Sequence, residues 1–243
     1  MKKAIGYVDV IAAAVCWGFL GLFNRVLTAA GVSLLNMMPL RFGGTAILFT
    51  VFCMMFKQQV FHIKLRHLPI FLGSGLISML LVLCGCALVS GIVGSDVGIS
   101  LEGLLMGLAS ELCYGGYTIF THYGMRYCDS FTMAYWTFLI AGIASLFLAD
   151  GPALLSALAE PRTGLAALGL MVMGTALPFT LYTKGLETVE SGKAAIIANI
   201  EPVMSAVIGV TVFQETLGLW TLVGIVLVLS GVVVLACEKE PDK

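Results

Sequence analysis

The sequence has few charged residues, and this scarcity excludes most soluble folds. Only 11% of its 243 residues are charged and 59% are hydrophobic, whereas a soluble domain carries about 25% charged residues. The net charge is −1, so the chain lacks the basic surface that binds nucleic acid. The composition therefore predicts a protein whose partner is the lipid bilayer, with no nucleic-acid partner.

The chain also lacks the short motifs of common enzymes. It contains no Walker loop, no glycine-rich dinucleotide motif opening a helix, no His-Glu-x-x-His and no Gly-x-Ser-x-Gly. Six of the seven cysteines lie in apolar stretches. The thiols of Cys84 and Cys86 would point about 200° apart around a helix and could not share a metal ion. We expect no catalytic residue, no bound metal and no cofactor, and hence no enzyme.

Long apolar stretches make up nearly the whole chain. Each is close to or above the ~20 residues that a helix needs to cross a bilayer. The stretches are continuous rather than alternating, which indicates helices and not the strands of a barrel. The sequence predicts an all-α polytopic membrane protein, a bundle of about eight transmembrane helices. The predicted spans are 10–30, 34–56, 68–94, 99–121, 131–149, 164–183, 194–213 and 217–237.

Basic residues are distributed unevenly between the two sides of this predicted bundle. One set of alternate turns carries nearly all of them, and the opposite turns hold only Arg162. Because cytoplasmic loops are enriched in Lys and Arg, both termini are predicted to be cytoplasmic in a multi-pass plasma-membrane protein. Asn24 and Arg25 interrupt the first apolar run and no signal-cleavage site follows, so we expect an uncleaved first helix. The basic residues are Lys2, Lys3, Lys57, Lys64, Arg66, Arg126, Lys184, Lys193, Lys239 and Lys243.

Charged residues inside the predicted spans are the strongest candidates for function. A charge at bilayer depth costs roughly 2.5–3.5 kcal/mol, so each needs a partner or a wet cavity. Arg41, Glu111 and Glu201 meet this description, and we expect Arg41 to pair with one of the two carboxylates. Each glutamate could instead be a protonated acid that bonds a neighbouring helix, and Arg25 could snorkel to the headgroups. The candidate substrate-path residues are Trp17, Asn24, Arg41, Glu111, Tyr114, Tyr117, Trp136, Asn199 and Glu201.

Two of these candidates have alternative interpretations. Trp136 follows Tyr135, and such a pair is also typical of the aromatic belt at a membrane surface. Glu201 precedes Pro202, whose missing amide leaves a carbonyl free in mid-helix; this favours a cavity or an ion pair for Glu201, and a hydrogen bond to another helix as a protonated acid is the alternative. The sequence alone leaves open whether these residues face a midplane cavity or serve only the architecture.

The chain repeats itself, and the first copy is incomplete. Cys16-Trp17-Gly18 matches Cys113-Tyr114-Gly115 at an offset of 97 residues. From Leu81 onward the offset becomes 146, because Leu81-Val-Leu-Cys-Gly85 matches Leu227-Val-Leu-Ser-Gly231. The first copy therefore lacks about 49 residues between Gly75 and Leu81, roughly two membrane crossings.

Several runs resemble the EamA type of the drug/metabolite transporter superfamily over nearly the whole chain. They are Ala-Ala-x-Cys-Trp-Gly in the first span, Arg41 in the second, Glu201-Pro202-Val203 followed by Glu215-Thr-Leu, and the final Gly224-x-x-Leu-x-x-x-Gly231-Val. The resemblance implies two inverted repeats of five helices, ten in all. It also implies export or uptake of small molecules such as amino acids, nucleobases or drugs.

This chain departs from that pattern in its first repeat. Residues 1–94 hold a shortened first EamA-like repeat of three spans, and residues 95–243 hold a complete second repeat of five. The span at 68–94 looks like a fusion of a third and a fifth helix, which we expect to form one continuous helix.

The expected function is transport of a small-molecule metabolite, weakened by the missing helices. A non-transporting or degenerate bundle that acts only as a homodimer or partner subunit is the alternative, and an intramembrane enzyme is a distant third.

Overall fold

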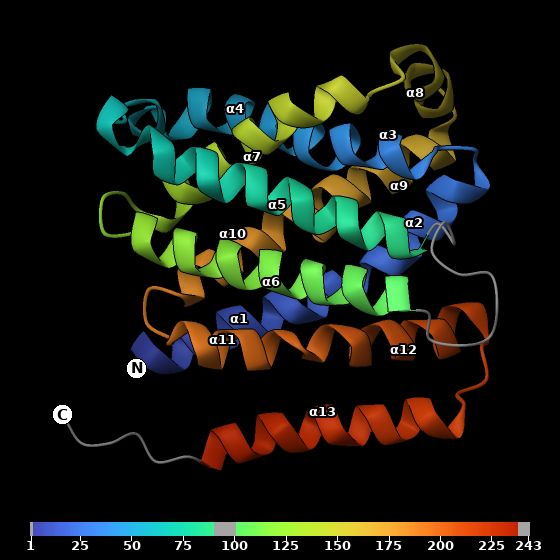
Figure 1. The fold of residues 1–243 in the computed structure, drawn as a ribbon. Helices are drawn as coiled ribbons and strands as arrows, with labels where there is room; N and C mark the ends of the chain where they lie inside the picture. Colours follow the sequence, from blue (N-terminus) through green and yellow to red (C-terminus); the bar gives the residue numbers. More distant parts are fainter. Residues whose placement is uncertain (1, 90–100, 238–243) are drawn as a thin grey trace.

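The computed structural model describes residues 2–89 and 101–237, and every regular element in these ranges is helical. Consecutive helices join end to end into rods that run alternately from one end of a bundle to the other (Figure 1). The elements of the rods are α1 (Lys2–Gly18), α2 (Leu20–Ala29), α3 (Leu34–Met38), η1 (Pro39–Gly43), α4 (Gly44–Phe56), α5 (Leu68–Val89), α6 (Leu101–Gly124), α7 (Ser130–Ser145), α9 (Pro161–Met171), η5 (Val172–Ala176), α10 (Leu177–Gly185), α11 (Ser191–Ala198), α12 (Ile200–Phe213) and α13 (Leu219–Cys237).

The predicted all-helical fold is confirmed, and the rods follow the predicted spans closely. Four stretches are long and apolar enough to cross a membrane, namely Ala4–Ala29, Leu35–Phe56, Pro161–Gly185 and Ser191–Phe213. Shorter apolar helices cover Leu68–Ser78, Ser130–Ser145 and Thr221–Val233. The number of rods that cross the bilayer, and the inverted-repeat arrangement, stay predictions. The short helix α8 (Gly151–Leu158) is an element that the hydropathy pattern did not indicate.

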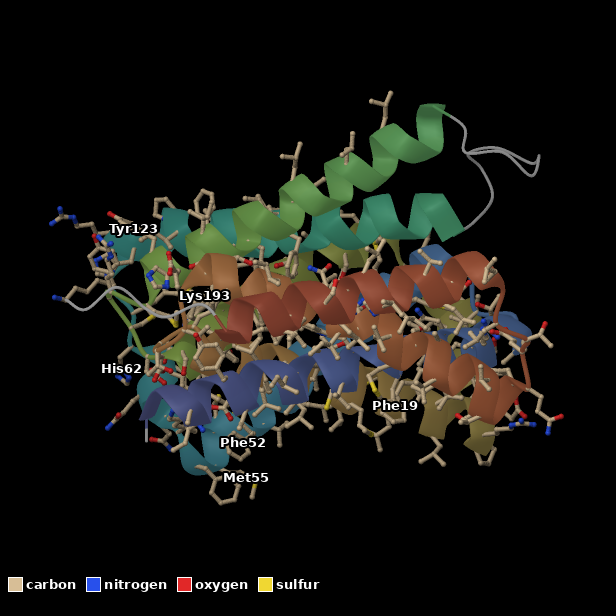
Figure 2. The ribbon with its side chains drawn as sticks, turned by 90° about the horizontal axis from the view of Figure 1, so that it is seen from below. Phe19, Phe52, Met55, His62, Tyr123 and Lys193 are labelled. Carbon is tan, nitrogen blue, oxygen red and sulfur yellow. The ribbon has the colours of Figure 1, made fainter. Side chains whose placement is uncertain are left out.

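The connections at the two ends of the bundle differ in charge. One end, called the basic end below, carries the connections η2 (Gln58–Phe61) and η3 (Leu65–His67). Figure 2 shows His62, Tyr123 and Lys193 together at this end. The opposite, distal end carries η4 (Leu146–Leu148), α8 and the turn between α12 and α13. Among the described basic residues of the basic end are Lys57, Lys64, Arg66, Arg126, Lys184 and Lys193.

The fused third span is one unbroken α-helix from Leu68 to Val89, as predicted. Residues 90–94 of the predicted span lie outside the described residues. The helix packs against α6 and α7, and hydroxyl groups connect the three. Ser74 Oγ lies 2.8 Å from Thr137 Oγ1 and 3.4 Å from Thr121 Oγ1. Bonds of this kind satisfy polar groups that lipid cannot satisfy.

The helix winding changes near proline in two rods, the one formed by α3, η1 and α4 and the one formed by α9, η5 and α10. Both η1 and η5 are π-helical; η1 begins at Pro39, and η5 ends two residues before Pro178. The rod formed by α11 and α12 breaks at Asn199, three residues before Pro202. Proline has no amide hydrogen, so the carbonyl four residues earlier loses its helical donor and the local winding changes. Single-turn π segments of this type are often found at functional sites.

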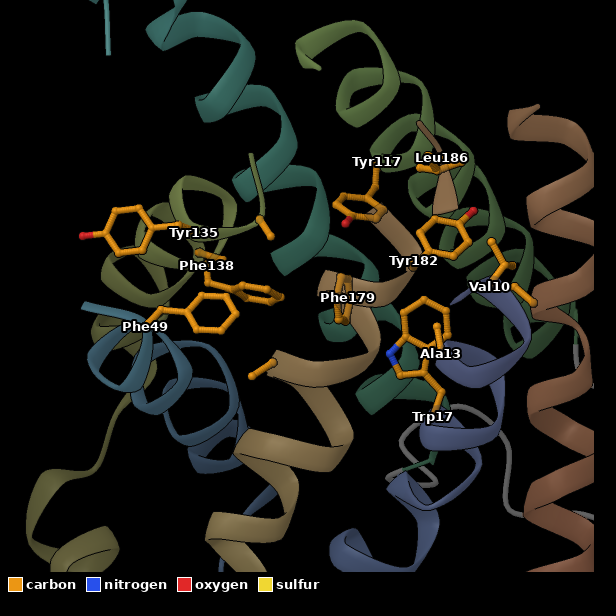
Figure 3. Packing of buried hydrophobic residues seen from close by; sticks show 14 of the residues in the cluster. Val10, Ala13, Trp17, Phe49, Tyr117, Tyr135, Phe138, Phe179, Tyr182 and Leu186 are labelled. Atoms are coloured by element: carbon orange, nitrogen blue, oxygen red, sulfur yellow. The ribbon is translucent and has the colours of Figure 1, made fainter. Parts of the chain in front are cut away.

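Helix α1 packs against α10 and α12 through glycine. A Cβ built on Gly185 would lie 2.5 Å from Val10 Cγ2 and 2.9 Å from the Gly6 carbonyl oxygen. A Cβ on Gly18 would lie 2.4 Å from Met204 Cβ. Such contacts are possible only without side chains, and close packing is what holds helices together in lipid. These contacts hold α1 against the larger cluster of buried hydrophobic residues in the described chain, to which Val10, Ala13 and Trp17 belong (Figure 3).

Candidate substrate site

Aromatic rings from three rods meet in the middle of the bundle. Trp17 of α1 is 4% exposed, and its ring centroid lies 5.1 Å from that of Phe179 and 5.4 Å from that of Tyr182, both of α10. Tyr114 of α6 completes the group at 6.4 Å from Trp17. Tyr117, one turn along α6, packs edge-on against Phe179 at 5.5 Å. Figure 3 shows Trp17, Tyr117, Phe179 and Tyr182 facing one another.

The phenol hydroxyls of this cluster differ in how they are bonded. Tyr182 Oη lies 3.3 Å from Thr118 Oγ1, and Tyr117 Oη lies 3.4 Å from Thr183 Oγ1. The Tyr114 hydroxyl is buried and makes no well-formed hydrogen bond to any described group, although Tyr182 lies beside it. A buried polar group without a partner costs about 1–3 kcal/mol.

Arg41 lies beside the aromatic cluster and links the two π segments. It belongs to η1, and its Nε donates a hydrogen bond of 3.1 Å to Thr175 Oγ1 of η5. The Thr175 hydroxyl in turn donates to the Leu170 carbonyl. The guanidinium carbon lies 6.0 Å from the centre of the Phe179 ring. The side chain is half-buried.

The two acidic candidates belong to α6 and α12. Glu201 is half-buried in the first turn of α12, near Tyr114. Glu111 lies on α6, one turn before Tyr114; its side chain is outside the part of the chain that the structure describes. The expected ion pair between Arg41 and one of these carboxylates stays a prediction.

Three other candidates lie apart from the cluster. Trp136 donates its indole N–H to the Val60 carbonyl at 2.9 Å, so it anchors η2 at the basic end. Asn199 is exposed and its amide bonds the Ala195 carbonyl of its own helix. Asn24 is half-buried in α2, next to Arg25. The structure thus brings together five of the predicted residues, which are Trp17, Arg41, Tyr114, Tyr117 and Glu201.

The sequence reasoning missed the role of Asp9 and the partner of Arg25. Asp9, near the start of α1, is buried, and its carboxylate lies 3.4 Å from Lys184 Nζ of α10. Arg25 pairs with Glu215 beyond α12 and lies 4.4 Å from the centre of the Phe213 ring. A negative residue in the first turns of an otherwise apolar helix was the available signal for Asp9. No local pattern identifies Glu215 as the partner of Arg25, because the two are 190 residues apart.

Comparison with known proteins decides the family. The sequence model of the EamA-like transporter family matches residues 101–237, more than half of the chain. The chain belongs to the EamA-like transporter family. The expected membership of the drug/metabolite transporters is thereby confirmed, and the protein is a helical membrane protein.

Individual relatives agree with this assignment. The chain is 41% identical to an uncharacterized transporter of Archaeoglobus fulgidus over 28% of this chain and 25% of the relative. It is 26% identical to the uncharacterized transporter YwfM of Bacillus subtilis over 70% of this chain and 57% of the relative. It is 25% identical to the uncharacterized inner membrane transporter YicL of Salmonella typhimurium, over 60% and 48% respectively. The chain thus spans between a quarter and just over half of the length of these relatives.

Proposed function

We propose that this EamA-like chain transports a small organic solute that carries an aromatic ring together with a negative and a positive group. The observation that carries this proposal is the set of groups that meet in the bundle. The Arg41 guanidinium carbon lies 6.0 Å from the centre of the Phe179 ring, the Trp17 ring lies 5.1 Å from that ring, and Tyr114 lies beside Trp17 with Glu201 near it. A zwitterion with an aromatic side chain matches this set of a cation, rings and an anion.

Each part of the arrangement has a chemical purpose in the proposal. The guanidinium of Arg41 offers donors to a carboxylate, and charge-assisted bonds of this type are strong in a low dielectric. The rings of Trp17 and Phe179 offer flat apolar surface and attract an ammonium group through their faces. The hydroxyl of Tyr114 and the carboxylate of Glu201 accept its N–H groups. The two π segments provide local winding that can change when the solute enters.

The test is uptake of radiolabelled phenylalanine into proteoliposomes that contain the purified protein. Arg41→Ala and Glu201→Gln should each lower the initial rate at least tenfold, since each removes one charged contact with the probe. Arg162→Ala is the matched control, because Arg162 lies at the distal end, outside the site. Its rate should equal that of the unsubstituted protein.

Parallel assays separate the charge types. Tetraphenylphosphonium, an aromatic cation, should depend on Glu201 and be indifferent to Arg41, and benzoate should show the reverse. Phenylalanine uptake that survives both Arg41→Ala and Glu201→Gln would contradict the proposed site. No uptake of any of the three probes by the unsubstituted protein would contradict the proposed class of substrate.

A further inference from the structure

Aromatic and basic side chains gather at the basic end, where α5 begins and α6 ends. The centres of the His67 and Tyr127 rings are 4.3 Å apart, and the two ring planes differ by 33°. The Tyr123 and Tyr127 hydroxyl oxygens are 3.0 Å apart, and the Arg126 guanidinium lies over the Tyr123 ring, 5.3 Å from its centre. Arg66 directly precedes His67 and lies near Tyr127. These five residues are called the Tyr127 cluster below, and Figure 2 shows Tyr123 at this end.

The two phenol hydroxyls of the Tyr127 cluster leave one hydrogen atom without an acceptor. Each phenol carries one hydrogen, and the bond between Tyr123 and Tyr127 uses only one of the two. No hydrogen bond to another described residue uses the second. Both side chains are exposed at the surface, by 44% and 47%. The second hydrogen can therefore be donated to an acceptor from outside the chain, such as a phosphate oxygen.

The cluster also carries positive charge that no described carboxylate neutralises. Among the described residues, neither Arg66 nor Arg126 forms an ion pair, whereas Lys57 at the same end is paired with Asp129. Asp129 is the acidic residue that lies closest to Arg126 along the chain, and Lys57 already occupies it. A guanidinium group matches the geometry of a phosphate and binds it through charge-assisted hydrogen bonds. The cluster thus combines two cations and a hydroxyl donor, the groups that bind a phosphate.

Exposed apolar side chains continue from the cluster along both of its helices. On α6, Ile119 lies one turn before Tyr123 and is 66% exposed. On α5, Leu72 and Leu76 lie one and two turns into the helix, and both are exposed. The two helices pack side by side (Figure 1). The phosphate-binding groups therefore lie at the ends of apolar helix surfaces, in the same order as the headgroup and the acyl chains of a phospholipid.

We propose that the Tyr127 cluster binds the headgroup phosphate of an anionic phospholipid whose acyl chains lie along α5 and α6. The guanidinium groups of Arg66 and Arg126 neutralise the phosphate, and the phenol pair donates its second hydrogen to a phosphate oxygen. Tyrosine at the depth of the headgroups and clustered basic residues are typical of lipid recognition. A soluble phosphate compound would present the same anion but would leave Ile119 and Leu72 uncovered. This lipid site does not depend on the proposed transported solute.

Native mass spectrometry of the purified protein in detergent tests the preference for an anionic lipid. The probe is phosphatidylglycerol, and phosphatidylcholine with the same acyl chains is the comparison, because it has a phosphate but no net charge. Phosphatidylglycerol should bind at least about tenfold more tightly, since two cations meet its charge. Glycerol 3-phosphate in large excess should not displace the lipid, because it lacks the acyl chains.

Substitutions separate a defined site from the general attraction of a basic surface. Arg66→Gln and Arg126→Gln should each weaken binding of phosphatidylglycerol about fivefold, because each removes one cation beside the phosphate. Replacing Tyr123 and Tyr127 together by Phe should weaken it about threefold without any change of charge, because both hydroxyls are lost. Lys64→Gln is the matched control, since Lys64 is an exposed cation of the connection that precedes α5. Its affinity should change by less than about twofold.

Other outcomes would overturn the proposal. An unchanged affinity in the double tyrosine variant would show that the cluster attracts lipid only as a basic surface. A loss in Lys64→Gln as large as that in Arg66→Gln would have the same meaning. Displacement by glycerol 3-phosphate would identify a soluble phosphate as the ligand, and equal binding of phosphatidylcholine would exclude recognition of the charge. The substituted side chains are exposed, so the fold should be retained; if an arginine variant fails to fold, the tyrosine variant still decides.

Discussion

Asp129 shows how single charges connect the rods at the basic end. It lies just before α7, and Lys57 at the end of α4 approaches its carboxylate to 3.0 Å. The Thr132 hydroxyl donates a second bond to the same group. Both charged side chains are about half exposed, so water and salt weaken the attraction between them. The main effect of the pair is to connect the end of α4 to the start of α7.

The environment of Asp129 predicts a pH dependence of stability. Burial raises the pKa of the Asp129 carboxyl. Hydrogen bonds from Thr132 and Lys57 and the charge of Lys57 together lower this pKa by a larger amount, so it lies below its ordinary value. A carboxyl with a lowered folded pKa stabilises the fold above its unfolded pKa of about 3.9, and this stabilisation is lost as pH falls through the folded value.

We therefore expect the melting temperature of the unsubstituted protein in detergent to exceed that of Asp129→Asn by a constant margin from about pH 7 to about pH 5. The margin should shrink below about pH 4. A margin that stays unchanged down to about pH 3 would show that the carboxylate charge is irrelevant. Lys57→Met should reduce the margin, because it removes the main positive partner.

Helices pack in this molecule wherever glycine removes the side chain between them. Gly6 and Gly185 let α1 and α10 touch at the basic end, and Gly18 lets the same rod touch α12. Apolar side chains elsewhere point outward, as Figure 2 shows for Phe52 and Met55. Since lipid is as apolar as these side chains, close backbone contact rather than hydrophobic burial selects which helices meet.

Gly185→Ala should destabilise the protein. The new methyl group would overlap Val10 and the Gly6 carbonyl, and overpacking of this kind costs typically 1–3 kcal/mol. Chemical unfolding in mixed detergent micelles would measure the loss. Gly192→Ala is the control, because its Cβ meets open space; alanine also favours the helix over glycine by about 1 kcal/mol. Equal stability of the two variants would argue against tight α1–α10 packing.

The continuous helix α5 leads to a labelling prediction. Ser78 is buried and donates to the Ser74 carbonyl one turn earlier. In inside-out membrane vesicles, which expose the basic end, a membrane-impermeant maleimide should therefore label Ser78→Cys no more than it labels the native cysteines. Lys64→Cys, in the exposed connection before α5, should be labelled. Equal labelling at the two positions would indicate that α5 re-enters the membrane rather than spanning it.

At the scale of the whole molecule, the two ends of the bundle differ in charge as the two sides of a membrane require. The basic end collects most of the described lysines and arginines, and there α1 begins and α13 ends (Figure 1). The distal end carries Arg162 and the pair of Arg25 with Glu215. The distribution predicts that the basic end faces the cytoplasm.

Reporter fusions test this orientation. Fusions after Lys64, Lys193 and Lys243 should report a cytoplasmic location, and a fusion after Arg162 should report an external one. The physical reason is that lysine and arginine near the membrane resist translocation. An external C-terminus would require an odd number of crossings and would overturn the assignment of eight spans.

The helices, their approximate limits and the family could be predicted from the sequence, because hydropathy and short motifs are local properties. The continuity of α5 followed from a run without proline or charge. The meeting of Trp17 with Phe179 and Tyr182, and of Arg41 with Thr175, could not be predicted in this way. The rods are similarly apolar, so hydropathy carries no information about which of them pair.

The sequence by itself determined that the chain lies in a bilayer as helices, and it predicts that one repeat is short. Only the tertiary structure decided which buried polar groups face one another. It also decided that Trp136 stabilises η2 instead of joining the aromatic cluster, and that Gly115 is uncovered while Gly18 is covered. The physical reason is that helix pairing in lipid depends on close steric fit between distant segments, and such fit exists only once the rods are packed together.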